Sequence, residues 1–260
     1  MTERARIPEL DGLRGIAIGM VFIFHYFTML VHPRHGSSLA YLAASTRLMW
    51  SGVDLFFVLS GFLIGGILLD VRASSNYFEV FYVRRFFRIV PIYFCCLIAY
   101  IGIVVAVHAG MAARFSYITA DRLPFASYIF FIQNFWMAAH NTLGGGGLGV
   151  TWSLAVEEQF YLTLPLIIRV VPRRHLMRVL LLGILLSLAT RIALYATHPG
   201  NQVSWYVLMP CRVDALFLGV LGAVWFRTPS FRGMFDRQRT SIRLALLALG
   251  CGVLLLMRFS

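Results

Sequence analysis

Long runs of apolar residues recur along the whole sequence, and they constrain the fold more than any other feature. Charged residues make up only 13% of the chain, about half of their share in soluble domains. A soluble fold of 260 residues cannot bury this much apolar surface, so we expect a membrane protein. Seven runs come close to the roughly 20 residues that a helix needs to cross hydrocarbon. They cover 13–31, 52–69, 89–109, 154–171, 177–196, 203–226 and 242–257.

The runs are continuous rather than alternating, which indicates helices. Helices also satisfy every backbone polar group inside lipid. The first run follows Arg4, Arg6 and Arg14, but it is too long for the apolar core of a cleaved signal peptide, so we interpret it as a retained first span. The expected fold class is all-α: a polytopic transmembrane helical bundle that forms a single domain over 1–260.

The positions of the arginines predict how the bundle is oriented. If the N-terminus is cytoplasmic, the arginine-rich segments 70–88, 169–178 and 227–243 also lie on the cytoplasmic side, as such segments usually do. This requires that 125–139 does not cross the membrane completely. Because that segment is short and contains two side-chain amides, we expect it to be re-entrant or interfacial. The pattern predicts about seven full spans plus one short or re-entrant helix, in the bacterial cytoplasmic (inner) membrane.

The basic residues also exclude several kinds of chemistry. All 23 are arginine, so the chain has no lysine for a phosphate-binding P-loop or for a Schiff base with pyridoxal phosphate. Basic residues of membrane proteins face anionic lipid, so the net charge of +12 favours membrane lipid as a partner and not nucleic acid. The four cysteines lie in apolar runs without the spacing of a disulfide framework or a zinc site, and we predict no metal site.

An ionisable pair occurs in the first run. Arg14 and His25 are eleven residues apart, close to three helical turns, so they share one face of a helix. Charged and polar residues inside a membrane usually face the bundle interior and serve a purpose. An imidazole can take a proton from an alcohol or carry an acyl group transiently. The competing interpretation is a polar residue that only bonds a neighbouring helix.

Four further motifs follow in order: GVDLFFVLSGFLI at 52–64, YVRRFFRIVPIY at 82–93, TWSLAVEEQFYL at 151–162 and RVDALFLGVLGA at 212–223. With the Arg14 and His25 pair, they resemble the acyltransferase-3 family of integral membrane acyltransferases. The resemblance implies acyl-coenzyme A, in particular acetyl-coenzyme A, as donor substrate, with no permanently bound cofactor. It also implies about ten spans, and the chain stops inside an apolar run, so we expect a C-terminally incomplete or unusually short member that lacks the last spans.

The resemblance also assigns roles to residues of this sequence. It implies catalytic roles for Arg14 and His25, and a signature of Trp152, Ser153, Glu158 and Tyr161 that acts in catalysis or supports the substrate. It implies coenzyme A binding for an arginine cluster. Guanidinium groups bind phosphate bidentately, and i, i+3 and i, i+4 spacing lets them converge on one helical face, although an ordinary cytoplasmic anchor would look the same. This cluster consists of Arg84, Arg85 and Arg88.

The remaining carboxylates and arginines have two interpretations each. We expect Glu158 to pair with Arg212 or Arg191, or to orient the ring of His25. Asp11 is three residues before Arg14 and is placed to hold it. Three more residues are expected to form buried ion pairs that fix helix register, with contact to substrate as the alternative. These are Asp54, Arg212 and Asp214.

The predicted function is that of a membrane-bound O-acyltransferase. It would move an acyl group, taken to be acetyl, from acyl-coenzyme A to a hydroxyl of a carbohydrate or related small-molecule acceptor outside the cytoplasm. The step is either direct transfer or a relay through an acyl-histidine. The alternative function is a transporter or flippase for an acyl or glycan substrate, because intramembrane arginine, histidine and glutamate also serve proton and anion pathways. Against a transporter, the sequence shows no internal repeat and no pair of interrupted spans in matching positions of two halves.

Overall fold

The computed structural model describes residues 8–28, 39, 42, 46–111, 116, 119, 123–144, 147–245, 247–248 and 252. All regular secondary structure in these residues is helical, which confirms the predicted all-α class. The chain divides into two compact units, 1–63 with 218–260 and 64–217. Two helices run from one unit into the other: α3 (Gly52–Asp70) and α10 (Val213–Trp225).

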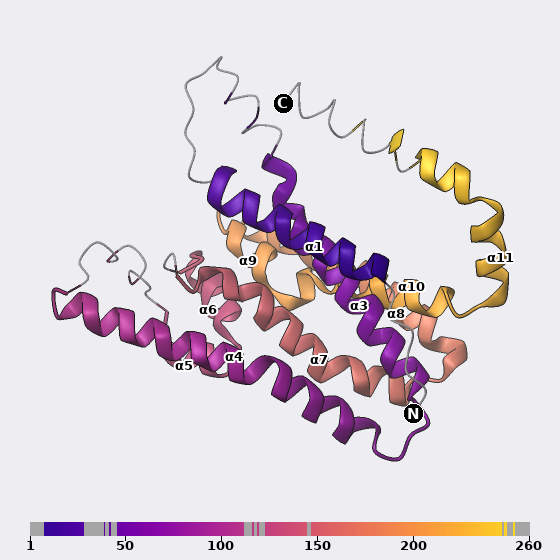
Figure 1. Cartoon of the computed structure of the whole chain (residues 1–260), viewed down its shortest axis with the longest axis horizontal. Helices are drawn as coiled ribbons and strands as arrows, with labels where there is room; N and C mark the ends of the chain where they lie inside the picture. The colour runs from indigo at the N-terminus through magenta and orange to yellow at the C-terminus, as the bar shows by residue number, and fades with distance from the viewer. Residues whose placement is uncertain are drawn as a thin grey trace. The chain divides into compact units, whose positions relative to one another are not determined.

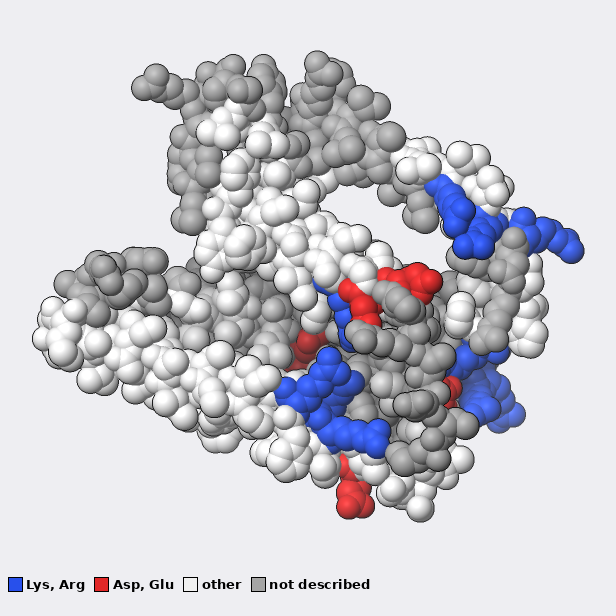
Figure 2. All heavy atoms as spheres, viewed as in Figure 1, with Lys and Arg blue, Asp and Glu red and all other residues white. Residues whose placement is uncertain are grey.

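Four helical stretches of the described residues are long and apolar enough to cross a bilayer. They are α1 (Pro8–Ile23) continued by the π-helix η1 (Phe24–Thr28), the 3-10 helix η2 (Arg47–Ser51) continued by α3, α4 (Tyr77–His108), and α8 (Arg173–Thr197). α4 and α8 leave most of their apolar length exposed, as lipid-facing helices do. In Figure 2 charged side chains gather in a few patches, and much of the drawn face of α4 carries none.

The predicted spans at 52–69 and 177–196 are confirmed as continuous helices, and 13–31 is confirmed as far as Thr28. The span predicted at 89–109 is the second half of α4, which is about 48 Å long at 1.5 Å per residue. The run at 154–171 forms one helix, α7 (Trp152–Val170). Most of the last predicted span, 242–257, lies outside the described residues.

The run at 203–226 is not the continuous helix that we predicted. It consists of α9 (Gln202–Val207), the 3-10 helix η5 (Met209–Cys211) and α10, with Leu208 extended between the first two. Pro210 accounts for the interruption, because proline has no N–H to donate to the carbonyl four residues earlier and its ring clashes with that carbonyl. An interrupted helix within a membrane protein is tolerated where protein covers it or where it lines a cavity.

The segment 125–139 is also interrupted. It forms α5 (Phe125–Ile129) and α6 (Gln133–His140), and neither is long enough to cross hydrocarbon. Phe131, between them, has φ 54°, a left-handed conformation that is strained for a bulky side chain. The segment therefore does not cross the membrane as a single helix, in agreement with its predicted short or re-entrant character.

In the first unit, glycines allow helices to approach closely. A Cβ atom on Gly52 would lie 2.8 Å from the carbonyl oxygen of Ala17 and 2.8 Å from Cβ of Met20, so the start of α3 touches the backbone of α1. A Cβ on Gly219 of α10 would overlap the carbonyl oxygen of Val58. Such contacts between small residues are how membrane helices pack without a hydrophobic driving force.

In the second unit, α4 and α7 run antiparallel side by side (Figure 1). The hydroxyl of Tyr77 donates to the carbonyl of Pro165 at 3.1 Å, and the hydroxyl of Tyr82 donates to that of Leu162 at 3.0 Å. Residues later in α4 therefore contact residues earlier in α7, as expected for antiparallel helices. This register brings the arginine cluster of α4 level with the TWSLAVEEQFYL motif.

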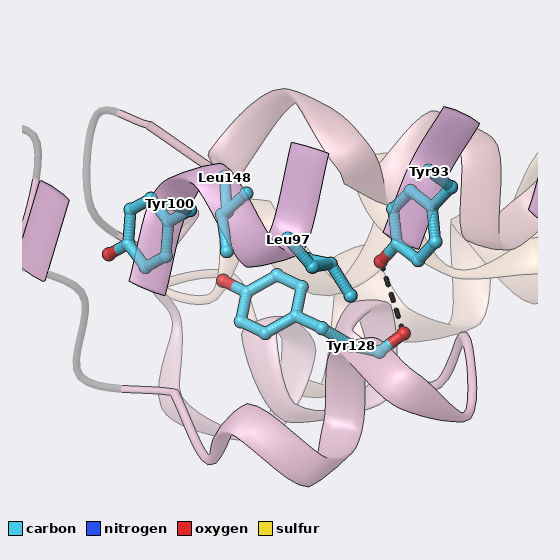
Figure 3. Packing of buried hydrophobic residues seen from close by; sticks show 5 residues of the cluster. All are labelled: Tyr93, Leu97, Tyr100, Tyr128 and Leu148. Carbon is cyan, nitrogen blue, oxygen red and sulfur yellow. Dashed lines mark hydrogen bonds between the residues drawn. The ribbon is translucent and has the colours of Figure 1, made fainter. Parts of the chain in front are cut away.

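Further along α4, aromatic residues form a buried cluster with α5 (Figure 3). The hydroxyl of Tyr93 donates to the carbonyl of Tyr128 at 3.1 Å, and its ring stacks on Phe131 with centroids 4.6 Å apart. Leu97, Tyr100 and Leu148 complete the cluster. The strained turn between α5 and α6 is thus held in place by α4.

Candidate active site

The first group of candidate residues lies on α1 and η1. Arg14 forms an ion pair with Asp11 at 3.8 Å, as we predicted. Nδ1 of His25 lies 2.8 Å from the carbonyl oxygen of Val21. A carbonyl oxygen can only accept, so Nδ1 carries the hydrogen, and in the uncharged ring Nε2 keeps its lone pair. That tautomer presents Nε2 as a base or a nucleophile.

The backbone around His25 departs from the regular α-helix that we assumed. Residues 24–28 form a π-helical turn, a feature that occurs often at functional sites. Thr28, at its end, donates from its hydroxyl to Oγ1 of Thr46 at 2.8 Å. Asp54 is partly buried in the first turn of α3, two residues after the close contact of Gly52 with α1. The helix that carries His25 is therefore supported from η2 and α3.

The second group joins α4 to α7. The guanidinium carbon of Arg85 lies 5.3 Å from the ring centroid of Tyr161 and 5.9 Å from that of Phe81, a cation–π arrangement. Glu158, one turn before Tyr161, interacts electrostatically with Arg85 and with Glu157. Its Oε1 atom is buried and accepts no hydrogen bond from the described residues. The structure thus brings together three of the predicted site residues.

The other two arginines of the cluster are placed differently. Arg84 and Arg88 are exposed, whereas Arg85 is partly buried between aromatic rings. The segment is helical, as the spacing argument required, but the three side chains differ in exposure. The i, i+4 pair of Arg84 and Arg88 shares a face, but Arg85 is turned towards α7 because Phe81, Tyr77 and Arg85 form the buried stripe of α4.

The third group surrounds the interruption between α9 and α10. Arg212 is buried, and its guanidinium carbon lies 5.4 Å from the ring centroid of Trp152 and 4.7 Å from that of Tyr206. Those two rings are themselves 4.7 Å apart. Ser153 has a local role, since its hydroxyl donates to the carbonyl of Val150 at 3.1 Å. The motif residues Trp152 and Arg212 therefore meet, and Tyr206 joins them without having been predicted.

Asp214 pairs with Arg191 of α8, so an ion pair ties α10 to α8. We predicted a buried ion pair at Asp214. A pair forms but is not fully buried, and its partner, Arg191, is one of the two arginines that we considered for Glu158. Both side chains are partly exposed, at 31% for Arg191 and 17% for Asp214. The pair is thus suited to fixing helix register.

The structure contains a network of side-chain amides that we did not predict from the sequence. Asn134 and Gln159 bond each other through both amides, at 3.2 and 2.9 Å. Gln159 also donates to the carbonyl of Phe131 at 2.9 Å, and Asn134 donates to that of Val207 at 3.3 Å. These bonds satisfy carbonyls at both interruptions, as buried polar groups require. The signal in the sequence was a pair of amides, Gln133 and Asn134, in an apolar stretch.

Metal binding has no support in the part of the chain that the structure describes, where no group of three His, Cys, Asp or Glu side chains could hold an ion.

The chain is similar to known proteins over nearly its whole length. Residues 7–260 match the model of the acyltransferase domain family, acyltransferase-3. The peptidoglycan O-acetyltransferase OatA of Listeria monocytogenes is 31% identical over 241 residues, which cover 86% of this chain and 35% of the relative. The O-acetyltransferase OatA of Staphylococcus aureus is 27% identical over 234 residues, which cover 84% of this chain and 35% of the relative.

The chain therefore spans 35% of the length of these curated relatives. No solved structure matches it. The long apolar helices and the relatives together identify a membrane protein. Since the family model covers all but the first six residues, the chain belongs to the acyltransferase-3 family of membrane acyltransferases.

Proposed function

We propose that this chain is an O-acetyltransferase that moves an acetyl group from acetyl-coenzyme A to a hydroxyl of a glycan. The relative from Listeria is named for peptidoglycan O-acetylation, and this supports a glycan as the acceptor. The arginine-rich segments support a bacterial inner-membrane location with a cytoplasmic N-terminus.

The observation that carries the proposal is the contact of His25 Nδ1 with the carbonyl oxygen of Val21, 2.8 Å away. This contact leaves the lone pair on Nε2. In direct transfer, Nε2 takes the proton of the acceptor hydroxyl while the hydroxyl oxygen attacks the thioester carbonyl carbon. The C–S bond then breaks and the proton passes to the sulfur, which gives an O-acetyl ester and free coenzyme A.

The relay differs from direct transfer because the first bond forms between Nε2 of His25 and the acetyl group. Nε2 itself attacks the thioester carbonyl carbon, the C–S bond breaks, the ring gives its Nδ1 proton to the leaving sulfur, and free coenzyme A and a neutral acetyl-histidine result. The acceptor hydroxyl then attacks that carbonyl carbon, and its proton returns to the imidazole as the C–N bond breaks. A relay predicts an acetyl-histidine that accumulates without acceptor, whereas direct transfer requires donor and acceptor together.

Arginines and Glu158 complete the proposed set of residues. Arg84 and Arg88 are exposed and free to bind the phosphates of coenzyme A, whereas Arg85 is held against Tyr161 and next to Glu158. Glu158 belongs to the proposed catalytic residues because its buried Oε1 atom can still accept a hydrogen bond. Arg14 joins the set because it lies eleven residues before His25 on the same helical stretch.

A transporter or flippase is the second candidate, and one observation favours it. The segments 125–140 and 202–225 are both interrupted and contact each other through α6 and α9. Interrupted helices often form the substrate sites of transporters. The sequence shows no internal repeat, and this still counts against the transporter.

The test is release of free coenzyme A thiol from acetyl-coenzyme A by the purified full chain in liposomes, with and without an extract of envelope glycans. We expect release that depends on the extract and that is lost in His25→Ala and reduced in Glu158→Gln. His108→Ala is the matched control, because its Nδ1 also lies 2.8 Å from the carbonyl four residues earlier. Uptake of labelled glycan without acetyl-coenzyme A, and no thiol release, would support the transporter instead.

A further inference from the structure

α11 (Pro229–Arg237) begins directly after an apolar helix. α10 ends at Trp225, and the turn that follows is closed by Thr228, whose backbone N–H and hydroxyl both donate to the carbonyl of Trp225, at 2.9 and 2.7 Å. The ring of Phe231 stacks on that of Trp225 with centroids 5.8 Å apart. The first turn of α11 is therefore held beside the end of α10.

α11 separates apolar from polar residues more strongly than the long helices α1, α3, α4 and α8. Phe231 and Met234 are three residues apart and share a side by helical spacing, whereas Ser230 and Arg237 flank Met234 and Gly233 lies further round the helix. Met234 is 46% exposed and Trp225 is 38% exposed. In a membrane protein, large apolar side chains that remain exposed at the end of an apolar helix, next to basic residues, fit the bilayer interface.

The same stretch is strongly basic. Residues 227–243 contain five arginines and one aspartate. Arg237, Arg239 and Arg243 are exposed, and arginine side chains gather over α11 and the helical residues 239–245 after it, at the upper right of Figure 2. Guanidinium groups bind phosphate oxygens in bidentate fashion. The stretch thus pairs an apolar face with a set of phosphate-binding groups.

We propose that α11 and residues 238–245 bind anionic phospholipid headgroups at the membrane surface. Phe231 and Met234 enter the boundary between headgroups and acyl chains, and Arg237, Arg239 and Arg243 bind lipid phosphates. Lipid is the occupant to expect because only three residues separate α11 from α10, so the nearest anionic surface is the membrane itself. This inference does not depend on the proposed acetyltransferase activity.

Hydrogen exchange of the full chain in lipid nanodiscs tests the proposal. Discs of phosphatidylcholine alone are compared with discs that also contain phosphatidylglycerol, and amide exchange is followed over 229–245. Each arginine near an anionic leaflet adds attraction worth on the order of fivefold in binding. We expect exchange to be slower by about tenfold or more in the anionic discs, and the difference to shrink at high salt.

Two variants with equal loss of charge identify the site. Arg237→Gln with Arg239→Gln and Arg243→Gln should abolish the dependence on phosphatidylglycerol. The control carries Arg173→Gln, Arg174→Gln and Arg178→Gln at the exposed start of α8 and should keep it. Equal exchange in both discs, a dependence that survives in the first variant, or equal slowing by soluble glycerol phosphate would each overturn the proposal.

Discussion

The helix that carries His25 and the helix that carries Glu158 fix their functional side chains in opposite ways. On α1 and η1, Arg14 is held by Asp11 and His25 by the carbonyl of Val21, all within one stretch of helix. On α7, neighbouring segments do this work: Arg85 comes from α4 and interacts with Glu158, and α6 bonds Gln159. Local contacts suffice to orient a reacting group, whereas α7 depends on the packing of the second unit.

The largest predicted effect is a loss of catalysis, without loss of stability, when His25 is replaced. His25→Ala should lower acetyl transfer by about 10²- to 10⁴-fold, the usual contribution of a general base or acid. Thermal unfolding in detergent should not change much, because His25 is only partly buried and bonds its own helix. A variant that keeps its activity would remove His25 from the mechanism; one that unfolds would show that η1 depends on the imidazole.

On α7 the comparison predicts loss of stability. Asn134→Leu and Gln159→Leu should each lower the free energy of unfolding by about 1–3 kcal/mol, because each leaves a buried amide without its partner. The double variant should be destabilised by less than the sum, since the two residues share one interaction. Denaturant unfolding of the four proteins measures this coupling, and Thr163→Val on the exposed side of α7 is the control. Strict additivity would mean that the amides act separately.

Substitutions at two glycines of α10 test how tightly this helix packs against α3 in the first unit. Gly219→Ala should cost about 1–3 kcal/mol of stability, because its Cβ would overlap the backbone of α3. Gly222→Ala, one turn later on the same helix, meets only the ring of Phe62 at 3.5 Å and should be nearly neutral. Thermal unfolding of both variants measures the difference. Equal melting temperatures would show that α3 and α10 separate at little cost.

The smallest effect concerns the local ion pair. Asp11→Asn should change the free energy of unfolding by less than about 1 kcal/mol, because both partners are partly exposed and 3.8 Å apart. The measurement is denaturant unfolding at low and at high salt. A larger loss that disappears with salt would show that α1 depends on this pair more than its exposure suggests.

Features that depend on one stretch of sequence were predictable. Continuous apolar runs located α3 and α8, the spacing of Asp11 and Arg14 predicted their pair, and the ordered motifs indicated the family. The amides at Gln133 and Asn134 correctly argued against a full span at 125–139. In each case the physical cause acts within a few helical turns.

Features that depend on packing were not predictable. Helical spacing allowed Arg84, Arg85 and Arg88 to converge, and only the contact with α7 decides that Arg85 alone turns inward. The π-helical turn at 24–28 has no compositional signal. The interruption at Leu208 does have a compositional signal, Pro210, but we predicted a continuous helix because the run is apolar throughout.

The amide network has a consequence for the order in which the protein is made. Asn134 on α6 finds its partners at Gln159 and Val207, which the ribosome adds 25 and 73 residues later. Until they arrive, a short helix with buried amides has no stable place in lipid, and an insertion machinery that selects for hydrophobicity has little reason to retain it. We therefore expect α6 to take its final place only after α7 and α9 have been made.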